Sequence, residues 1–220
     1  MIDWGWLADH VPALAFRTGQ HLYFTAIAVS VGLAISLALG LVATRRRSLY
    51  PPFSLFAGLV YVIPSLAMFA ALVPIVGLSL LTAEIPLVLY TLVILLRNVV
   101  AGLDSVAPDV REAADAVGYV GRARLLRVEL PLAVPLIVAG VRIATVSTIG
   151  LVTITALLGD AFGGLGFFIY EGAQRGFATE IYAGAVPTIL LALALDRLFV
   201  GLQGRLTPWA RHRADGAAAG

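Results

Sequence analysis

The chain has 220 residues, of which 60% are hydrophobic and 13% are charged, with a formal net charge of +2. The mean hydropathy of +0.95 is far from that of a soluble domain, so the composition indicates an integral membrane protein. All 15 basic residues are Arg and there is no Cys. This excludes a Walker A lysine, a Schiff-base lysine, disulfides and thiolate metal sites.

The N-terminal segment, residues 1–20, opens with Asp3 and Asp9 rather than with the basic residues of a secretory signal. Trp4 and Trp6 favour the membrane interface, so we expect a short external amphipathic lead-in. An unstructured tail with incidental aromatic residues is the alternative.

Five apolar runs are long enough, at about 1.5 Å per residue, to cross a hydrocarbon core about 30 Å thick. They lie near residues 21–43, 53–77, 85–103, 134–158 and 181–203. The expected fold class is therefore all-α and integral to the membrane, with about five transmembrane helices. The transmembrane domain would cover residues 21–203, with one long polar connection at 104–133 and a tail at 204–220.

The distribution of Arg predicts the orientation, because basic residues near span ends are retained in the cytoplasm. Three basic clusters follow the first span, the third span and the fifth span. Their members are Arg45, Arg46 and Arg47; Arg111, Arg122, Arg124 and Arg127; Arg205, Arg211 and Arg213. The opposite side has only Arg17 and Arg175. Five crossings with the N-terminus outside and the C-terminus in the cytoplasm place all three clusters inside.

The polar connection carries a spaced pattern of small, acidic and turn-forming residues. In order, these are Glu112, Ala113, Ala114, Gly118, Val128, Leu130 and Pro131. Alanine favours a helix and lets a partner surface approach closely, and Asp109 is a candidate helix cap. Gly118 permits a backbone turn, and Pro131 marks the start of the next span. A surface helix without a partner is the alternative interpretation.

The pattern resembles the EAA signature of ABC importer permeases and departs from it only by Val128 in place of Ile. The resemblance implies a type I, MetI-like permease of the cell membrane, without catalytic or metal-binding residues of its own. It implies that Glu112, Ala113, Ala114, Gly118, Leu130 and Pro131 couple to a separate ABC ATPase, which binds the ATP and Mg. Further implied partners are a second permease, identical or homologous, and an extracytoplasmic substrate-binding protein, but no nucleic acid.

Four shorter patches are similar to the osmoprotectant branch of this family. They are His21–Tyr23, Ile63–Ala67, Leu96–Asn98 and Gly163–Gly166, and the similarity extends over about residues 20–200. This branch imports glycine betaine, choline, carnitine and related quaternary ammonium compounds. Another betaine-like solute, such as ergothioneine, or an amino-acid-like solute is the alternative.

Residues that interrupt the apolar runs are candidates for the pathway or its gate. They are Tyr61, Pro64, Ser65, Phe69, Arg97, Asn98, Arg142, Thr145, Gly163, Gly164 and Gly166. An Arg at the centre of a span costs about 2.5–3.5 kcal/mol, so Arg97 is expected to face the bundle interior or the cytoplasmic interface. Tyr61 and Phe69 offer cation–π contacts to an ammonium group, although simple packing is the alternative.

The competing functional class is an ion-coupled carrier, which would normally show a relay of acidic residues inside the membrane. Within the predicted spans we find only Asp196, which is adjacent to Arg197. The sequence therefore favours the ATP-driven class.

Overall fold

A computed structural model of the chain describes residues 2–206, which contain helices and no strand. The helices are α1 (Trp4–Asp9), α2 (Val11–Arg45), η1 (Arg47–Leu49), α3 (Tyr50–Val62), α4 (Ser65–Val76), α5 (Leu80–Asp104), α6 (Pro108–Ala116), α7 (Arg122–Arg124), η2 (Leu125–Glu129), α8 (Leu130–Val152), η3 (Thr153–Leu158), α9 (Gly166–Arg175) and α10 (Ala178–Leu206). The expected all-α fold class is confirmed.

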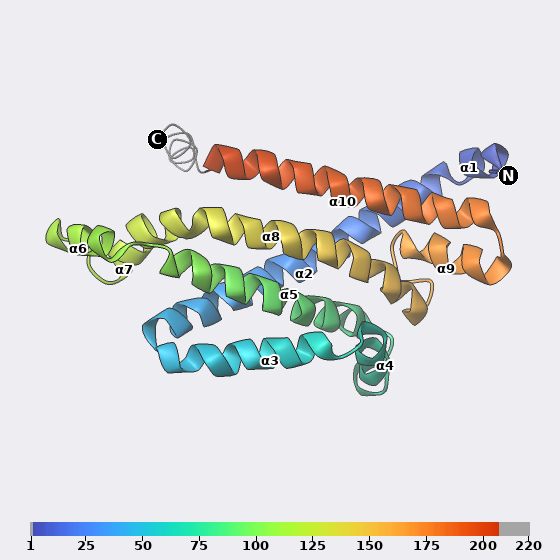
Figure 1. Cartoon of the computed structure of the whole chain (residues 1–220). Helices are drawn as coiled ribbons and strands as arrows, with labels where there is room; N and C mark the ends of the chain where they lie inside the picture. Colours follow the sequence, from blue (N-terminus) through green and yellow to red (C-terminus); the bar gives the residue numbers. More distant parts are fainter. Residues whose placement is uncertain (1, 207–220) are drawn as a thin grey trace.

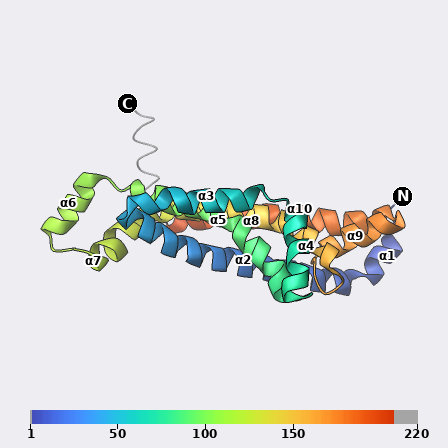
Figure 2. The same cartoon turned by 90° about the horizontal axis from the view of Figure 1, so that it is seen from below.

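The helices form an elongated bundle with two distinct ends (Figures 1 and 2). One end, which we call the inner end, carries η1, α6, α7 and the last turns of α10. The other, which we call the outer end, carries α1 and α9. The basic clusters after the first and third spans lie at the inner end, as does Arg205, whereas Arg211 and Arg213 lie outside the described residues.

Four stretches of the described chain are long and apolar enough to span a membrane, namely α2, α5, residues 122–158 and α10. They confirm four of the five predicted spans, although α2 begins at Val11, ten residues before the expected boundary. The second predicted span, 53–77, is present as a bent pair of helices rather than one straight helix, because α3 and α4 meet at an angle of 95°; counted as one broken span, the pair gives the expected five. Pro64 has no N–H to donate and holds Ile63 in an extended conformation, which ends α3.

Helix α5 lies at the centre of the bundle and packs against α2, α3, α4 and α8. Small residues allow the closest contacts, as is usual between helices in membranes. A Cβ atom added at Gly32 of α2 would lie 1.9 Å from the Thr91 hydroxyl, and one added at Gly140 of α8 would lie 2.5 Å from the Asn98 Cβ. These glycines therefore set the spacing of α2 and α8 from α5.

Helix α10 lies against α8 and α9 and is largely exposed along its length. Arg142 of α8 forms a two-bond ion pair with Asp196 of α10, in which Nη2 lies 3.0 Å from Oδ2 and Nε donates to Oδ1. Because each charge has a partner of opposite sign, the cost of placing both in an apolar environment is reduced.

Gly140→Ala should destabilise the protein by about 1–3 kcal/mol, because its methyl group overlaps Asn98. Gly150→Ala is the matched control on the same helix, since a Cβ there meets nothing within 4 Å and gains helix propensity. Thermal unfolding of the purified protein in detergent measures the difference. Equal melting temperatures for the two variants would show that the α5–α8 contact is not tightly packed.

Candidate functional site

Helix α6 projects from the inner end of the bundle (Figures 1 and 2). It begins at Pro108 with Ala107 as its N-cap residue, so the expected capping role of Asp109 is wrong. Proline suits the first helical position because its missing N–H would have no helical partner there, and Asp109 lies in the first turn instead. Glu112 is exposed one turn further on.

The C-terminal end of α6 is closed by a Schellman turn. The Tyr119 N–H donates to the Ala114 carbonyl at 2.9 Å, and the Gly118 N–H donates to the Asp115 carbonyl at 3.0 Å. Gly118 has a φ of 89°, a conformation in which a side chain would be strained. The turn predicted at Gly118 is therefore present, and it directs the chain from α6 towards α7.

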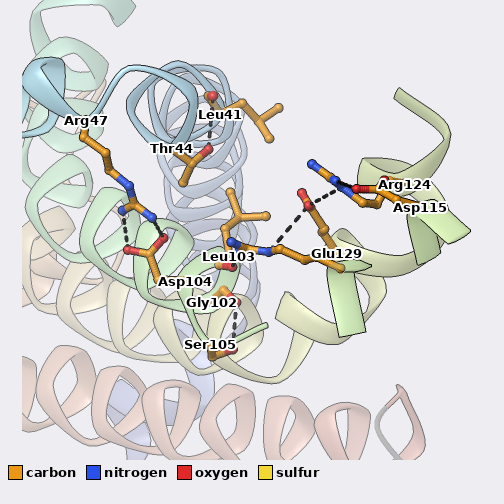
Figure 3. Close-up of polar contacts among 11 residues, drawn as sticks. Leu41, Thr44, Arg47, Gly102, Leu103, Asp104, Ser105, Asp115, Arg124 and Glu129 are labelled. Carbon is orange, nitrogen blue, oxygen red and sulfur yellow. Dashed lines mark hydrogen bonds and ion pairs between the residues drawn. The ribbon is translucent and has the colours of Figure 1, made fainter. Parts of the chain in front are cut away.

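An ion-pair network centred on Glu129 ties α6 to the membrane helices (Figure 3). Glu129 Oε1 accepts a hydrogen bond from Arg124 Nε at 3.0 Å and lies 3.6 Å from Arg111 Nε. Arg124 also pairs with Asp115 of α6, and Arg111 donates to the Leu103 carbonyl near the end of α5 at 2.7 Å. The network thus joins α6, η2 and α5 through one half-buried carboxylate.

The junction with α8 follows the predicted pattern. Leu130 is the first residue of α8, and Pro131 lies in its first turn. The preceding segment, η2, is a π-helical turn that ends at Glu129. Such turns are rare and often occur at functional sites.

A second ion pair at the inner end joins η1 to the last turn of α5. Arg47 donates to both carboxylate oxygens of Asp104, at 2.6 Å and 2.5 Å (Figure 3). Between the two ion-pair systems lies a cavity of about 520 Å³ with a largely basic wall. Its charged lining residues are Arg45, Arg47, Arg111, Arg122, Arg124 and Glu129.

A cavity of about 430 Å³ lies where α3 breaks from α4, and α5 and α8 complete its wall. Of the predicted pathway residues, Tyr61, Pro64 and Ser65 line it. Tyr90 and Thr91 of α5 also line it and are absent from the predicted set. Tyr90 and Thr91 are adjacent polar residues within the third apolar run, and this is the sequence signal that could have identified them as pathway candidates.

The other candidates of the second to fourth spans lie elsewhere. Phe69 is 1% exposed and packs in an apolar core with Phe24 and Leu87. Asn98 donates to the Ile94 carbonyl and contacts α8, while Arg97 is exposed. Arg142 is ion-paired with α10, and the Thr145 hydroxyl donates to the Val141 carbonyl of its own helix.

The glycine-rich segment is tied to the beginning of α2 at the outer end. The Gly164 N–H donates to Gln20 Oε1 at 3.2 Å, and the Leu165 N–H donates to His21 Nδ1 at 3.3 Å. His21 Nε2 therefore carries the ring proton and donates it to the Ile149 carbonyl at 2.9 Å. A Cβ at Gly164 would lie 2.7 Å from the His21 Cβ, so the structure brings two of the family-like patches into contact.

The candidates Gly163 and Gly166 pack closely in the same segment. A Cβ at Gly163 would lie 2.5 Å from the Ala156 Cα, and one at Gly166 would lie 2.2 Å from the Thr153 carbonyl oxygen. The backbone of the segment therefore packs directly against η3, which leaves no room for a side chain at either glycine. None of the three glycines lines the cavity at the α3–α4 break.

Asp196 is not the only acidic residue inside a span, so that interpretation of the sequence is wrong. Helix α5 begins at Leu80, five residues before the predicted boundary, and it therefore includes Glu84. Glu84 is 5% exposed, and neither carboxylate oxygen has a hydrogen-bond partner among residues 2–206. It lines an otherwise apolar cavity with Ile27 and Val31 of α2.

Comparison with known proteins identifies the family of the chain. The model of the family described as "Binding-protein-dependent transport system inner membrane component" matches residues 30–212. The chain is 36% identical over 208 residues to the osmoprotectant import permease protein OsmW of Salmonella typhimurium, covering 92% of this chain and 96% of the relative. It is 33% identical over 195 residues to the glycine betaine/carnitine/choline transport system permease protein OpuCB of Bacillus subtilis, covering 89% of each.

A solved structure shows the same fold. An inward-facing structure of the MetNI methionine ABC transporter contains a chain that superposes with a TM-score of 0.78 at 23% identity, covering 88% of this chain and 96% of that one. The family match covers most of the chain, and both relatives exceed 30% identity over nearly their whole length. This chain therefore belongs to the family of binding-protein-dependent transport system inner membrane components.

Proposed function

We propose that this chain is the membrane-spanning subunit of an ATP-driven importer of a small osmoprotectant. The names of its relatives support a quaternary ammonium compound such as glycine betaine, choline or carnitine as the solute. ATP and Mg bind to a separate ATPase subunit, and an extracytoplasmic binding protein delivers the solute. The chain itself is a permease and has no enzymatic role.

The observation that carries the proposal is the position and attachment of α6. Its exposed Glu112 lies at the end of the molecule where the basic clusters lie, which is the cytoplasmic end by the distribution of Arg. The Glu129 network connects α6 to η2 through Arg111, and Arg111 also binds α5. A force applied by an ATPase at Glu112 would therefore reach α5 directly and α8 through η2, and both of these helices line the cavity at the α3–α4 break.

The exposure of the cavity lining supports a pair of permeases. Tyr61 is 49% exposed and Val62 is 79% exposed, so one wall of the cavity lies at the surface of the chain. A second permease copy, or a homologous one, would close this side. ATP-driven closure of two ATPases then favours one permease arrangement over the other, because the ATPases bind that arrangement better.

Glu112→Arg should lower ATP-driven uptake of radiolabelled glycine betaine by at least about tenfold, since it places a positive charge where the ATPase is expected to bind. Gly118→Leu should act in the same direction, because leucine is strained at a φ of 89°. Uptake is measured in proteoliposomes that contain the permease, the ATPase and the binding protein.

Asp9→Arg at the outer end makes the same change of charge far from α6 and serves as the control. All three variants should insert into the membrane in normal amounts. Unchanged uptake by Glu112→Arg would refute the coupling role of α6. Coupled uptake of an amino acid, with none of any quaternary ammonium compound, would refute the proposed substrate class.

Glu129→Ala should reduce the substrate-stimulated part of ATP hydrolysis severalfold while leaving the basal rate unchanged. The variant removes the carboxylate that joins Arg111 and Arg124, so α6 loses its ion-pair link to η2, while the bonds of Arg111 to Leu103 and of Arg124 to Asp115 remain and the surface of α6 is unchanged. The control is Arg47→Ala, which removes an ion pair at the same end that does not contact α6. If both variants retain wild-type stimulation, the network does not transmit the coupling.

A further inference from the structure

The cavity at the α3–α4 break combines an uncharged wall with two aromatic rings. Its lining includes hydroxyl, aromatic and aliphatic side chains, and no Asp, Glu, Arg or His. Tyr61 and Tyr90 lie edge to face, with ring centroids 5.7 Å apart and planes at 65°. A quaternary ammonium group cannot donate a conventional hydrogen bond, but it is attracted to the electron-rich faces of aromatic rings.

The broken span presents two helix ends of opposite polarity to this cavity. Helix α3 ends at Val62, and among the described residues the carbonyls of Tyr61 and Val62 accept no backbone hydrogen bond from the start of α4. Helix α4 begins at Ser65, whose N–H likewise has no recorded backbone acceptor. The end of a helix carries a partial negative charge and its beginning a partial positive charge.

The hydroxyl group of one buried threonine provides a second, independent indication of a ligand. Thr148 of α8 is 1% exposed and lines the cavity, yet no hydrogen bond from its hydroxyl is recorded within residues 2–206. The neighbouring Ser147 also lines the cavity but is exposed. The Thr148 hydroxyl is not among the fully buried unpaired atoms of the described residues, so it is accessible from the cavity and can bond to a ligand there.

The Tyr90 hydroxyl fixes the break in place, because it donates to the carbonyl of Ile63 between the two helices. Ile63 and Pro64 are the two residues between α3 and α4, so this bond links α5 directly to the break. The ring of Tyr90 is thereby held against the cavity beside Tyr61.

We propose that this cavity is a binding site, within the permease itself, for a zwitterionic quaternary ammonium solute. The ammonium group lies against Tyr61, Tyr90 and the terminal carbonyls of α3. The carboxylate lies at the beginning of α4, within reach of Ser65 and of the Thr148 hydroxyl. The proposal rests on the proposed function and adds a recognition step after release from the binding protein.

The test is direct binding of radiolabelled glycine betaine to the purified permease–ATPase complex in nanodiscs, without the binding protein. Tyr61→Leu should weaken binding by about tenfold or more, because it removes the aromatic ring that makes the cation–π contact. Tyr61→Phe is the matched control and should bind nearly as well as the wild type, since it keeps the ring. Thr148→Val should weaken binding of glycine betaine but not of choline, which has no carboxylate.

A competition experiment on the unmodified complex keeps the proposal testable if a variant fails to fold. The competitor 3,3-dimethylbutanoate has the shape and carboxylate of glycine betaine but carbon in place of the charged nitrogen. It should compete at least about tenfold more weakly than unlabelled glycine betaine. Equal competition, or equal binding by Tyr61→Leu and Tyr61→Phe, would overturn the proposal.

Two further outcomes separate this proposal from the proposed function. If the complete system imports glycine betaine but the complex without its binding protein binds none, the internal site is refuted and the importer assignment stands. If the complete system imports no quaternary ammonium compound, both are refuted together.

Discussion

The structure depends on the requirement that backbone N–H and C=O groups find partners in hydrocarbon, where water is absent. Long helices satisfy this requirement along α2, α5, α8 and α10. At the helix ends, where backbone groups lack helical partners, other groups of the protein or a ligand must supply them. At the outer end, side chains of α2 bind the backbone of the glycine-rich segment, and at the inner end Arg111 binds the Leu103 carbonyl. At the α3–α4 break, Tyr90 binds one carbonyl, and other backbone groups remain available to a ligand.

Two helices connect the candidate coupling site to the candidate pathway. Helix α5 carries Tyr90 and Thr91 at the cavity and ends beside the Glu129 network. Helix α8 carries Thr148 at the cavity and begins directly after Glu129. The two helices pack tightly through Gly140 and Asn98, so they are expected to move together rather than slide. A displacement of α6 would then move α5 and α8 as one unit and change the shape of the cavity that they line.

Much of this arrangement could be predicted from the sequence. The length of an apolar run and the spacing of Glu112, Gly118 and Pro131 involve residues that are close together in the chain, so they can be recognised without knowing the tertiary contacts. The 95° bend was not predictable in the same way. Pro64 shows that a helix is interrupted, but the direction of the chain afterwards depends on α5, which supplies Tyr90. The pairing of Arg142 with Asp196 joins residues 54 positions apart and leaves no local signal. Glu84 was missed because a hydropathy boundary is less precise than a helix boundary.

The central claim is that α6 faces the cytoplasm and contacts an ATPase. Because the chain has no Cys, single-cysteine variants report on one position without background. Val117→Cys, exposed at the end of α6, should react with a membrane-impermeant maleimide only after the membrane is opened, and should crosslink to the ATPase subunit. Gln174→Cys on α9 should react in intact cells. Labelling of Val117→Cys from outside intact cells would contradict the account.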